Sequence, residues 1–197
     1  MGRPSNKQER RSEIVRAMME VMAVKGYEGA SIQAVAKQAG LTPGLIHYHF
    51  QTKQAILLES VNQLSDVLKK RYEALAERSK TPGDKLKAFI NARLSKGEGA
   101  NHQAVAAWVM IGSEAVRQPE VKLVYLAALK EQKALLEELL SDYFRLVLKK
   151  NALKKKELES KVAFVMAFME GAFLLSVSAS EIMPENWAAE ALLTQLV

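Results

Sequence analysis

The sequence predicts an all-α protein of about nine helices, with a three-helix N-terminal domain followed by a C-terminal helical bundle. Apolar residues recur at helical spacing along almost the whole chain of 197 residues, and no segment shows the alternation of a strand. Glycines, prolines and short polar segments separate the apolar runs. Within residues 31–50, two of these runs are short and stand on either side of a glycine. This pattern predicts a helix-turn-helix.

Both short helices have clear start and stop signals. Ser31 can cap the first helix, and Gly40 can adopt the positive φ that ends it. Thr42 stands at the next N-cap position, and Pro43 follows at the first helical position, where its missing N–H costs nothing. The second helix then runs toward Phe50. A helix-turn-helix presents this second helix to the major groove of DNA.

The second helix has an apolar face and an outer face rich in rings. The side chains that can point inward are Leu41, Ile46 and Phe50. Those left outside are Thr42, Pro43, Leu45, His47, Tyr48 and His49. Hydroxyl, phenol and imidazole groups donate hydrogen bonds that phosphate oxygens accept, and Gly44 removes a side chain where the backbone can come close. We therefore interpret the outer face as a DNA contact surface, the alternative being a helix end packed under a neighbouring element.

Several features follow one another over about fifty residues: a long first helix, a Gly-Tyr pair at 26 and 27, the two-helix unit, and an aromatic exit before Thr52 and Lys53. In order and spacing, residues 10–58 resemble the DNA-binding domain of TetR-family transcriptional regulators. The resemblance places these residues where the family usually touches DNA: Gln33, Thr42, Pro43, Gly44, His47, Tyr48 and Lys53, with His49 close by. The family most often has Tyr at the position of His47, so a different operator preference is expected.

The resemblance implies a helix-turn-helix DNA-binding domain in residues 1–53 and a ligand-binding and dimerisation domain in residues 54–197. It further implies a transcriptional regulator, a repressor that a small, largely apolar effector releases from double-stranded operator DNA. The alternative is a DNA-binding regulator controlled by a protein partner, without a small-molecule effector. No nucleophile motif, phosphate-binding glycine loop or metal-binding helix motif points to an enzyme, and no cofactor is expected.

Charge and composition agree with this interpretation. The first 53 residues carry eight basic and four acidic side chains, so most of the net charge of +6 lies where DNA is expected. Arg3, Lys7, Arg10 and Arg11 form a basic arm that either follows the DNA or remains solvated.

Other composition features limit the possible functions. The chain has no cysteine, and its three histidines lack the spacing of a metal site: two of them are two residues apart, and the third is distant. The first residues are polar, and the apolar stretches elsewhere are amphipathic or interrupted. We therefore expect no metal site, no signal peptide and no membrane span, and a soluble, cytoplasmic protein.

The other helices are separated by recognisable turns. The expected helices cover residues 12–25, 53–80, 82–96, 103–117, 120–150, 154–178 and 184–197. Residues 97–101 are the expected flexible loop, and a lysine-rich turn surrounds Asn151.

One of these helices predicts self-association. Nearly every side of residues 158–177 is apolar, so both faces of this helix must be covered, and Gly171 with Ala172 would allow close approach. Trp187 and Leu192 belong to a second apolar stripe on the last helix. An isologous four-helix interface in a homodimer would cover the apolar faces of both helices. A three-layer monomer core is the alternative.

An effector site is expected among the C-terminal helices. The candidate ligand-binding residues are Phe89, Trp108, Ile111, Glu114, Tyr125, Phe168 and Met169. Glu114 could orient a polar group, whereas the apolar members serve equally well as ordinary core residues. Residues 106–121, AAWVMIGSEAVRQPEV, also resemble the C-terminal domains of choline-responsive repressors of the BetI type.

Overall fold

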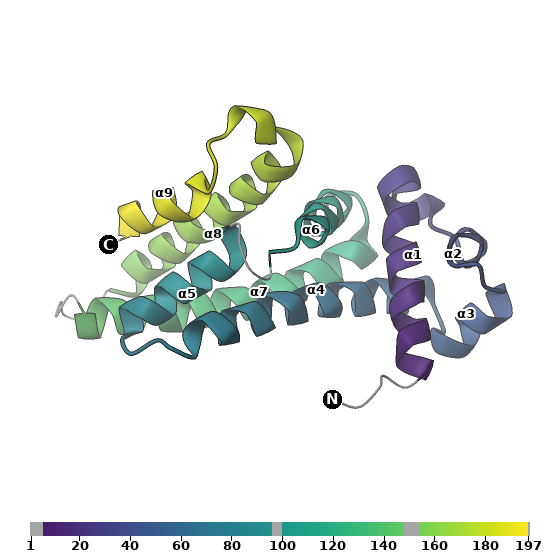
Figure 1. The fold of residues 1–197 in the computed structure, drawn as a ribbon, viewed down its shortest axis with the longest axis horizontal. Helices are drawn as coiled ribbons and strands as arrows, with labels where there is room; N and C mark the ends of the chain where they lie inside the picture. The colour runs from purple at the N-terminus through teal and green to yellow at the C-terminus, as the bar shows by residue number, and fades with distance from the viewer. Residues whose placement is uncertain (1–5, 96–99, 148–153, 197) are drawn as a thin grey trace. The chain divides into compact units, whose positions relative to one another are not determined.

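The computed structural model of the chain describes residues 6–95, 100–147 and 154–196, and these residues form nine α-helices without a strand (Figure 1). The all-α prediction is confirmed. The chain divides into two compact units. The first comprises Met1–Leu64 and Met110–Ala128, and the second comprises Ser65–Val109 and Leu129–Val197. The first unit therefore extends beyond residue 53 and includes a distant stretch of sequence.

Three helices that follow one another in sequence form the centre of the first unit: α1 (Asn6–Gly29), α2 (Ile32–Ala39) and α3 (Pro43–His49). Each of them packs against the other two (Figure 1). The start of α4 (Lys53–Ala76) completes this core. Its fully buried side chains include Ile14, Met18, Met22, Val35, Ile46, Ile56 and Leu57. Each buried aliphatic side chain of this size stabilises the fold by about 1.5–3 kcal/mol.

The turn between α2 and α3 has the predicted chemistry. Gly40 is left-handed, with φ of 67°, and its N–H bonds back to carbonyl groups of α2. The Ser31 hydroxyl accepts a hydrogen bond from the Ala34 N–H, and Thr42 caps α3 in the same way by accepting from the Leu45 N–H. Local sequence thus fixes both ends of the turn.

A hinge interrupts α1 near its end. Gly26 has φ of 68° and ψ of 176°, outside the helical region, and a Cβ built there would lie 3.2 Å from Glu114 Oε1 of α6 (His102–Ala115). The next residue, Tyr27, is buried, and its hydroxyl donates a 2.9 Å hydrogen bond to Glu120 of α7 (Pro119–Asp142). Burial and this carboxylate raise the pKa of Tyr27 well above its usual range. The end of α1 is therefore tied to α6 and α7.

One arginine connects three helices of the first unit. Arg11 of α1 donates hydrogen bonds to the His49 carbonyl oxygen at 2.8 Å and to Glu59 Oε2 of α4 at 2.6 Å. Its guanidinium also lies 4.1 Å from the centroid of the Phe50 ring. The side chain thus holds the last turn of α3 against α1 and α4.

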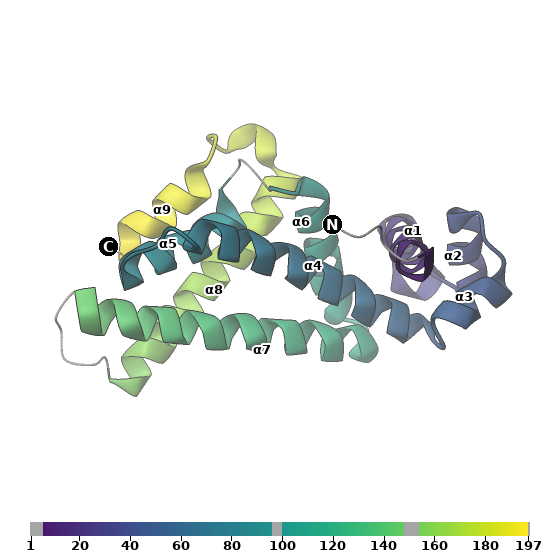
Figure 2. The ribbon, with the colours of Figure 1, turned by 60° about the horizontal axis from the view of Figure 1, so that its bottom comes forward.

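The second unit contains α5 (Pro82–Leu94), α8 (Lys155–Ser178) and α9 (Trp187–Leu196), together with the remaining parts of α4, α6 and α7. The helix α5 packs against both α8 and α9, as Figure 2 shows for α9. A five-residue π-helical turn, Tyr143–Val147, continues α7 and also contacts α5. Thr81 and Asp84 form a capping box at the start of α5.

The helix boundaries differ modestly from those expected. The helix α4 ends at Ala76 rather than at residue 80, and the expected helix over 120–150 is α7 followed by the π-helical turn. The last helix begins at Trp187, after a short 3₁₀ turn at Ser180–Ile182. Most of the expected loop at 97–101 and the centre of the lysine-rich turn lie outside the described residues.

The helix α8 has the two apolar faces that its sequence predicts. Val162, Val165, Met169, Ala172 and Phe173 are buried within the unit. On the other side, a stripe of exposed or half-buried residues comprises Phe164, Ala167, Phe168, Gly171 and Leu174. Among the described helices, α8 is also the one whose length and composition would allow it to cross a membrane, which by itself is weak evidence because helices of soluble proteins pass the same test.

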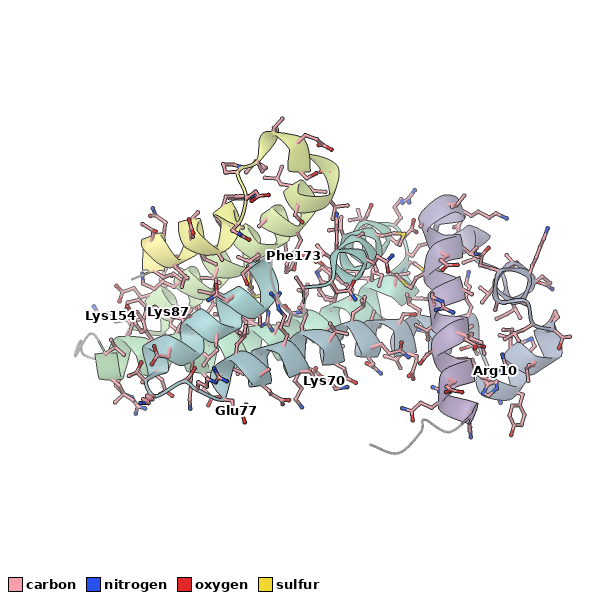
Figure 3. All side chains as sticks on the ribbon, in the orientation of Figure 1. Arg10, Lys70, Glu77, Lys87, Lys154 and Phe173 are labelled. Atoms are coloured by element: carbon pink, nitrogen blue, oxygen red, sulfur yellow. The ribbon has the colours of Figure 1, made fainter. Side chains whose placement is uncertain are left out.

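We predict that Arg11→Met lowers the free energy of unfolding by about 1–2 kcal/mol, because two charge-assisted hydrogen bonds and the contact of the guanidinium with the Phe50 ring are lost. Arg10, labelled in Figure 3, is the matched control, since among the described residues its ion pair is with Glu13 on the same helix. Arg10→Met should cost less than about 0.5 kcal/mol. Urea unfolding followed by circular dichroism measures the free energy of unfolding of both variants. Equal losses in the two variants would contradict the role given to Arg11.

Candidate nucleic-acid interface

The helix α3 buries one side and exposes the residues that sequence predicts for DNA contact. Ile46 is fully buried, whereas Thr42, Pro43, His47 and Tyr48 are exposed. Tyr48 keeps 71% of its surface accessible, which is unusual for an aromatic side chain without a partner to cover it. The predicted faces are confirmed for Ile46 and Phe50 on the inside and for these four residues on the outside, whereas Leu41, Leu45 and His49 are half-buried.

Two further candidate residues lie open at the same motif. Gln33 is exposed on the first turn of α2. Gly44 is exposed on α3, and a Cβ built there would meet no atom within 4 Å. Packing among the described residues therefore does not require a glycine at position 44. The sequence analysis suggests another reason, a close approach of the helix backbone to DNA.

His49 differs from the other ring residues of α3. It is half-buried, its ring meets the Tyr48 ring edge to face at 5.0 Å, and its carbonyl oxygen accepts the bond from Arg11. Within the described part of the chain, its Nδ1 atom has no hydrogen-bond partner. Burial, and then the positive charge of Arg11, lowers the pKa of His49 below the usual histidine value. The imidazole of His49 is therefore mostly uncharged at neutral pH, and its contact with DNA stays a prediction.

Lys53 also makes contacts within the protein. Its ammonium group donates a 2.9 Å hydrogen bond to the Tyr27 carbonyl oxygen and lies 4.0 Å from the centroid of the Tyr27 ring. An ammonium has three donors, so a phosphate contact at this edge remains open to it. Lys53 thus fixes the start of α4 to the end of α1 as well as carrying charge.

The basic arm has mixed roles. Arg3 lies outside the described residues, Lys7 is exposed, and Arg11 is the internal clamp described above. A surface groove between α1 and α2 is lined by Arg10, Glu13, Arg16, Ala17, Glu20, Gln38 and Ala39. Its two carboxylates offset its two arginines, so the groove offers no strongly positive surface.

The seven candidate ligand residues fall into two groups. Ile111, Glu114 and Tyr125 lie in the first unit, whereas Phe89, Trp108, Phe168 and Met169 lie in the second. Glu114 is buried and pairs with Arg117 at 2.8 Å, and Trp108 donates a hydrogen bond to Glu170. The assignment of these seven residues to an effector site stays a prediction.

The second unit also contains a cavity of about 420 Å³ whose lining includes none of those seven residues. Its apolar wall is built by Leu94, Val105, Ala172, Phe173, Trp187 and Ala188. Its polar lining includes Arg71, Arg93, Asn101, His102 and Asn186. The sequence held one signal for it: Arg93 lies four residues after Phe89 and seven after Leu86, on the buried stripe of α5. A charged side chain on a buried helix stripe is directed into the protein interior.

Comparison with known proteins agrees with this architecture. Residues 14–60 match the family model for bacterial regulatory proteins of the tetR family. BetI, an HTH-type transcriptional regulator of Rhizobium meliloti, is 29% identical over 113 residues, which cover 57% of this chain and 55% of BetI. BetI of Agrobacterium fabrum is 28% identical over 113 residues, covering 57% of this chain and 54% of that protein. The chain thus aligns with about half the length of these curated relatives.

Solved structures share the fold over nearly the whole chain. A transcriptional regulator from Rhodococcus sp. Rha1 is 24% identical, with a TM-score of 0.72 over 94% of this chain and 93% of its own. The regulator FadR of Bacillus subtilis, in complex with stearoyl-CoA, is 20% identical, with a TM-score of 0.74 over 94% and 97%.

A regulator of Saccharomonospora viridis, in complex with choline, is 18% identical, with a TM-score of 0.69 over 96% of this chain and 94% of its own. At these identities the structural likenesses concern the fold. The chain is thus similar to the tetR family of bacterial regulatory proteins in residues 14–60, and to the BetI relatives over 113 residues.

Proposed function

We propose that the chain is a DNA-binding transcriptional regulator that binds an operator as a homodimer and is released from it by a small-molecule effector, as a repressor is. The observation that carries the proposal is the exposed face of α3 and its N-cap, which presents Thr42, Pro43, His47 and Tyr48 to solvent. The opposite face of the helix is packed against its unit. Ile46 and the Arg11 bonds anchor that helix in its unit.

The exposed residues divide by chemistry into reading and positioning groups. The phenol of Tyr48 donates a hydrogen bond that any phosphate can accept, which positions the protein without reading the sequence. Thr42, Pro43 and His47 lie toward the start of α3, the part of a recognition helix that meets base edges. We assign operator preference to these three residues.

Dimer formation is supported by α8. The stripe from Phe164 to Leu174 leaves apolar side chains exposed at a spacing of three and four residues, and at Gly171 a Cβ would meet no atom within 4 Å. A second copy can cover such a stripe by two-fold pairing. Two recognition helices in one dimer would then read half-sites about 34–36 Å apart, or a multiple of that distance.

Effector control is supported by the cavity and by helices that have residues in both units. The helix α6 lines the cavity with His102 and Val105 and, farther along, supplies Glu114 beside Gly26. Likewise, α4 supplies Arg71 to the cavity and Lys53 to Tyr27. An effector that shifts these helices would act on α1, and differential binding of the two states sets the size of the response. Control by a protein partner is the second candidate, and the cavity favours the first.

We predict that Tyr48→Phe weakens binding to all duplexes about fivefold, the value of one lost hydrogen bond of about 1 kcal/mol. His47→Ala should instead change the preferred base pair at one position, by about 1–3 kcal/mol. Binding of both variants to a randomised duplex library, and to one nonspecific duplex, separates these effects. His102→Ala, also an exposed histidine, is the control and should leave the preference unchanged. A changed preference in Tyr48→Phe with unaltered nonspecific affinity would reverse the assigned roles.

We predict that Gly171→Gln leaves the folded protomer intact, because a side chain there enters open space, yet weakens the dimer. Overpacking a close interface costs about 1–3 kcal/mol, or about 5-fold to 150-fold in the dissociation constant. Sedimentation equilibrium measures the change. Leu123→Gln is the matched control, since Leu123 is 66% exposed and lies on α7. An unchanged dimer in Gly171→Gln, or a wild-type protein that is monomeric at micromolar concentration, would remove the proposed interface.

A further inference from the structure

The charge of Arg93 is buried, and no acidic side chain among the described residues pairs with it. Only 8% of this residue is exposed, and among the described residues it forms no ion pair. Its guanidinium donates one 3.2 Å hydrogen bond to the Phe89 carbonyl oxygen and stacks 3.5 Å from the centroid of the Phe89 ring. Its Nε atom has no partner within the described part of the chain.

Such an arrangement is unfavourable for folding alone. Removing a charge from water costs several kcal/mol unless an opposite charge and further hydrogen bonds compensate. Burial lowers the pKa of Arg93 to about 10, which still leaves the group protonated at neutral pH. The stacking on Phe89 recovers part of the cost, because a desolvated cation is attracted to the face of an aromatic ring. A buried arginine with an unused donor is a typical feature of an anion site.

The surroundings of Arg93 have the composition of an anion site. Arg93 lines the 420 Å³ cavity together with a second guanidinium, that of Arg71. Arg71 is held in place by 2.9 Å hydrogen bonds to the carbonyl oxygens of Ala92 and Ser95 at the end of α5. No aspartate or glutamate occurs among the described residues that line the cavity. Phe173, labelled in Figure 3, and Trp187 supply apolar surface to the same cavity.

We propose that this cavity binds a small organic anion, a carboxylate attached to an apolar body. The carboxylate binds at Arg93 and Arg71, and the apolar body packs against Phe173 and Trp187. The volume suits a small ligand, since such sites usually enclose about 300–1,000 Å³. As an effector site this assignment rests on the proposed function, whereas as a binding site it does not.

The two guanidinium groups that line this cavity disfavour a cationic ligand such as choline. A quaternary ammonium binds best over aromatic faces with no cation nearby, and two guanidinium groups in one cavity oppose it. An expectation of choline as the ligand, carried over from that relative or from a likeness to BetI, therefore conflicts with the residues of this cavity.

The first experiment compares ligands that differ in charge. Octanoate, octanamide, choline and inorganic phosphate are added to the full chain, and the Tm and the binding isotherm are measured without DNA. Octanoate at about 100 times its dissociation constant should raise the Tm by several degrees through mass action, while octanamide and choline at the same concentration should not. Equal binding of octanoate and octanamide, no binding of octanoate, or a response to phosphate alone would overturn the proposal.

The second experiment changes the cavity. Arg93→Met removes the charge and keeps the length, so it should abolish octanoate binding without lowering the Tm of the free protein. Ser176 lines the same cavity, and Ser176→Glu supplies an internal carboxylate that should also abolish octanoate binding, while the neutral control Ser176→Gln keeps it. The Ser176 pair remains informative even where Arg93→Met does not fold. Octanoate binding that is unchanged in Arg93→Met or in Ser176→Glu would overturn the proposal.

Operator binding is measured on the same samples. The anion site and its role as an effector site are then tested separately. Loss of octanoate affinity in saturating operator, by the same factor as the loss of operator affinity in saturating octanoate, supports both. Octanoate that binds at Arg93 without changing operator affinity supports the anion site and contradicts its role as an effector site. Operator binding without any octanoate binding contradicts the anion site alone.

Discussion

The shortness of α3 is the constraint on which the first unit depends. A helix of seven residues has almost no stability of its own in water, because the first turn costs more than its hydrogen bonds return. Its shape must come from its surroundings: the Thr42 cap, the burial of Ile46 and Phe50, and the hydrogen bond that Arg11 donates to the carbonyl oxygen of His49. Because Ile46 and Phe50 are buried on the inner side of the helix, its outer side can carry exposed polar and aromatic residues.

Sequence reasoning was sufficient where the determinant is local. Gly40, Thr42 and Pro43 occupy the conformations that their chemistry predicts, and the periodicity of α3 and α8 correctly separated their faces. It was insufficient where the partner is distant in sequence. Arg11 looks like part of a basic arm until the structure brings it to Glu59, and the bond of Lys53 to Tyr27 spans 26 residues. Charge counts report neither partner, so they overstate the number of cations available to DNA.

The same limit explains why the cavity residues differ from the candidates chosen by sequence. Those candidates were mostly large apolar side chains, which are also the residues that build a core, and Phe89, Ile111 and Met169 are indeed almost completely buried. A cavity needs instead a place where helices fail to fill the space between them, and no periodicity reports such a place. Arg93 is recognisable in the sequence as a charge on an apolar stripe, but only the structure shows that its Nε lacks a partner among the described residues and that Arg71 lines the same cavity.

Tyr27 is the point at which these features meet. Its hydroxyl bonds to Glu120 of α7, its carbonyl oxygen accepts from Lys53 of α4, and it follows the non-helical Gly26, which lies against Glu114 of α6. The helices α4, α6 and α7 are therefore all fixed to the last turn of α1, and each also has residues in the second unit. Since an α-helix is stiff along its axis and the backbone at Gly26 is not helical, a shift of these three helices would be absorbed at the hinge. In the proposed regulator, Gly26 and Tyr27 are therefore the residues of the first unit on which the three helices with residues in both units converge.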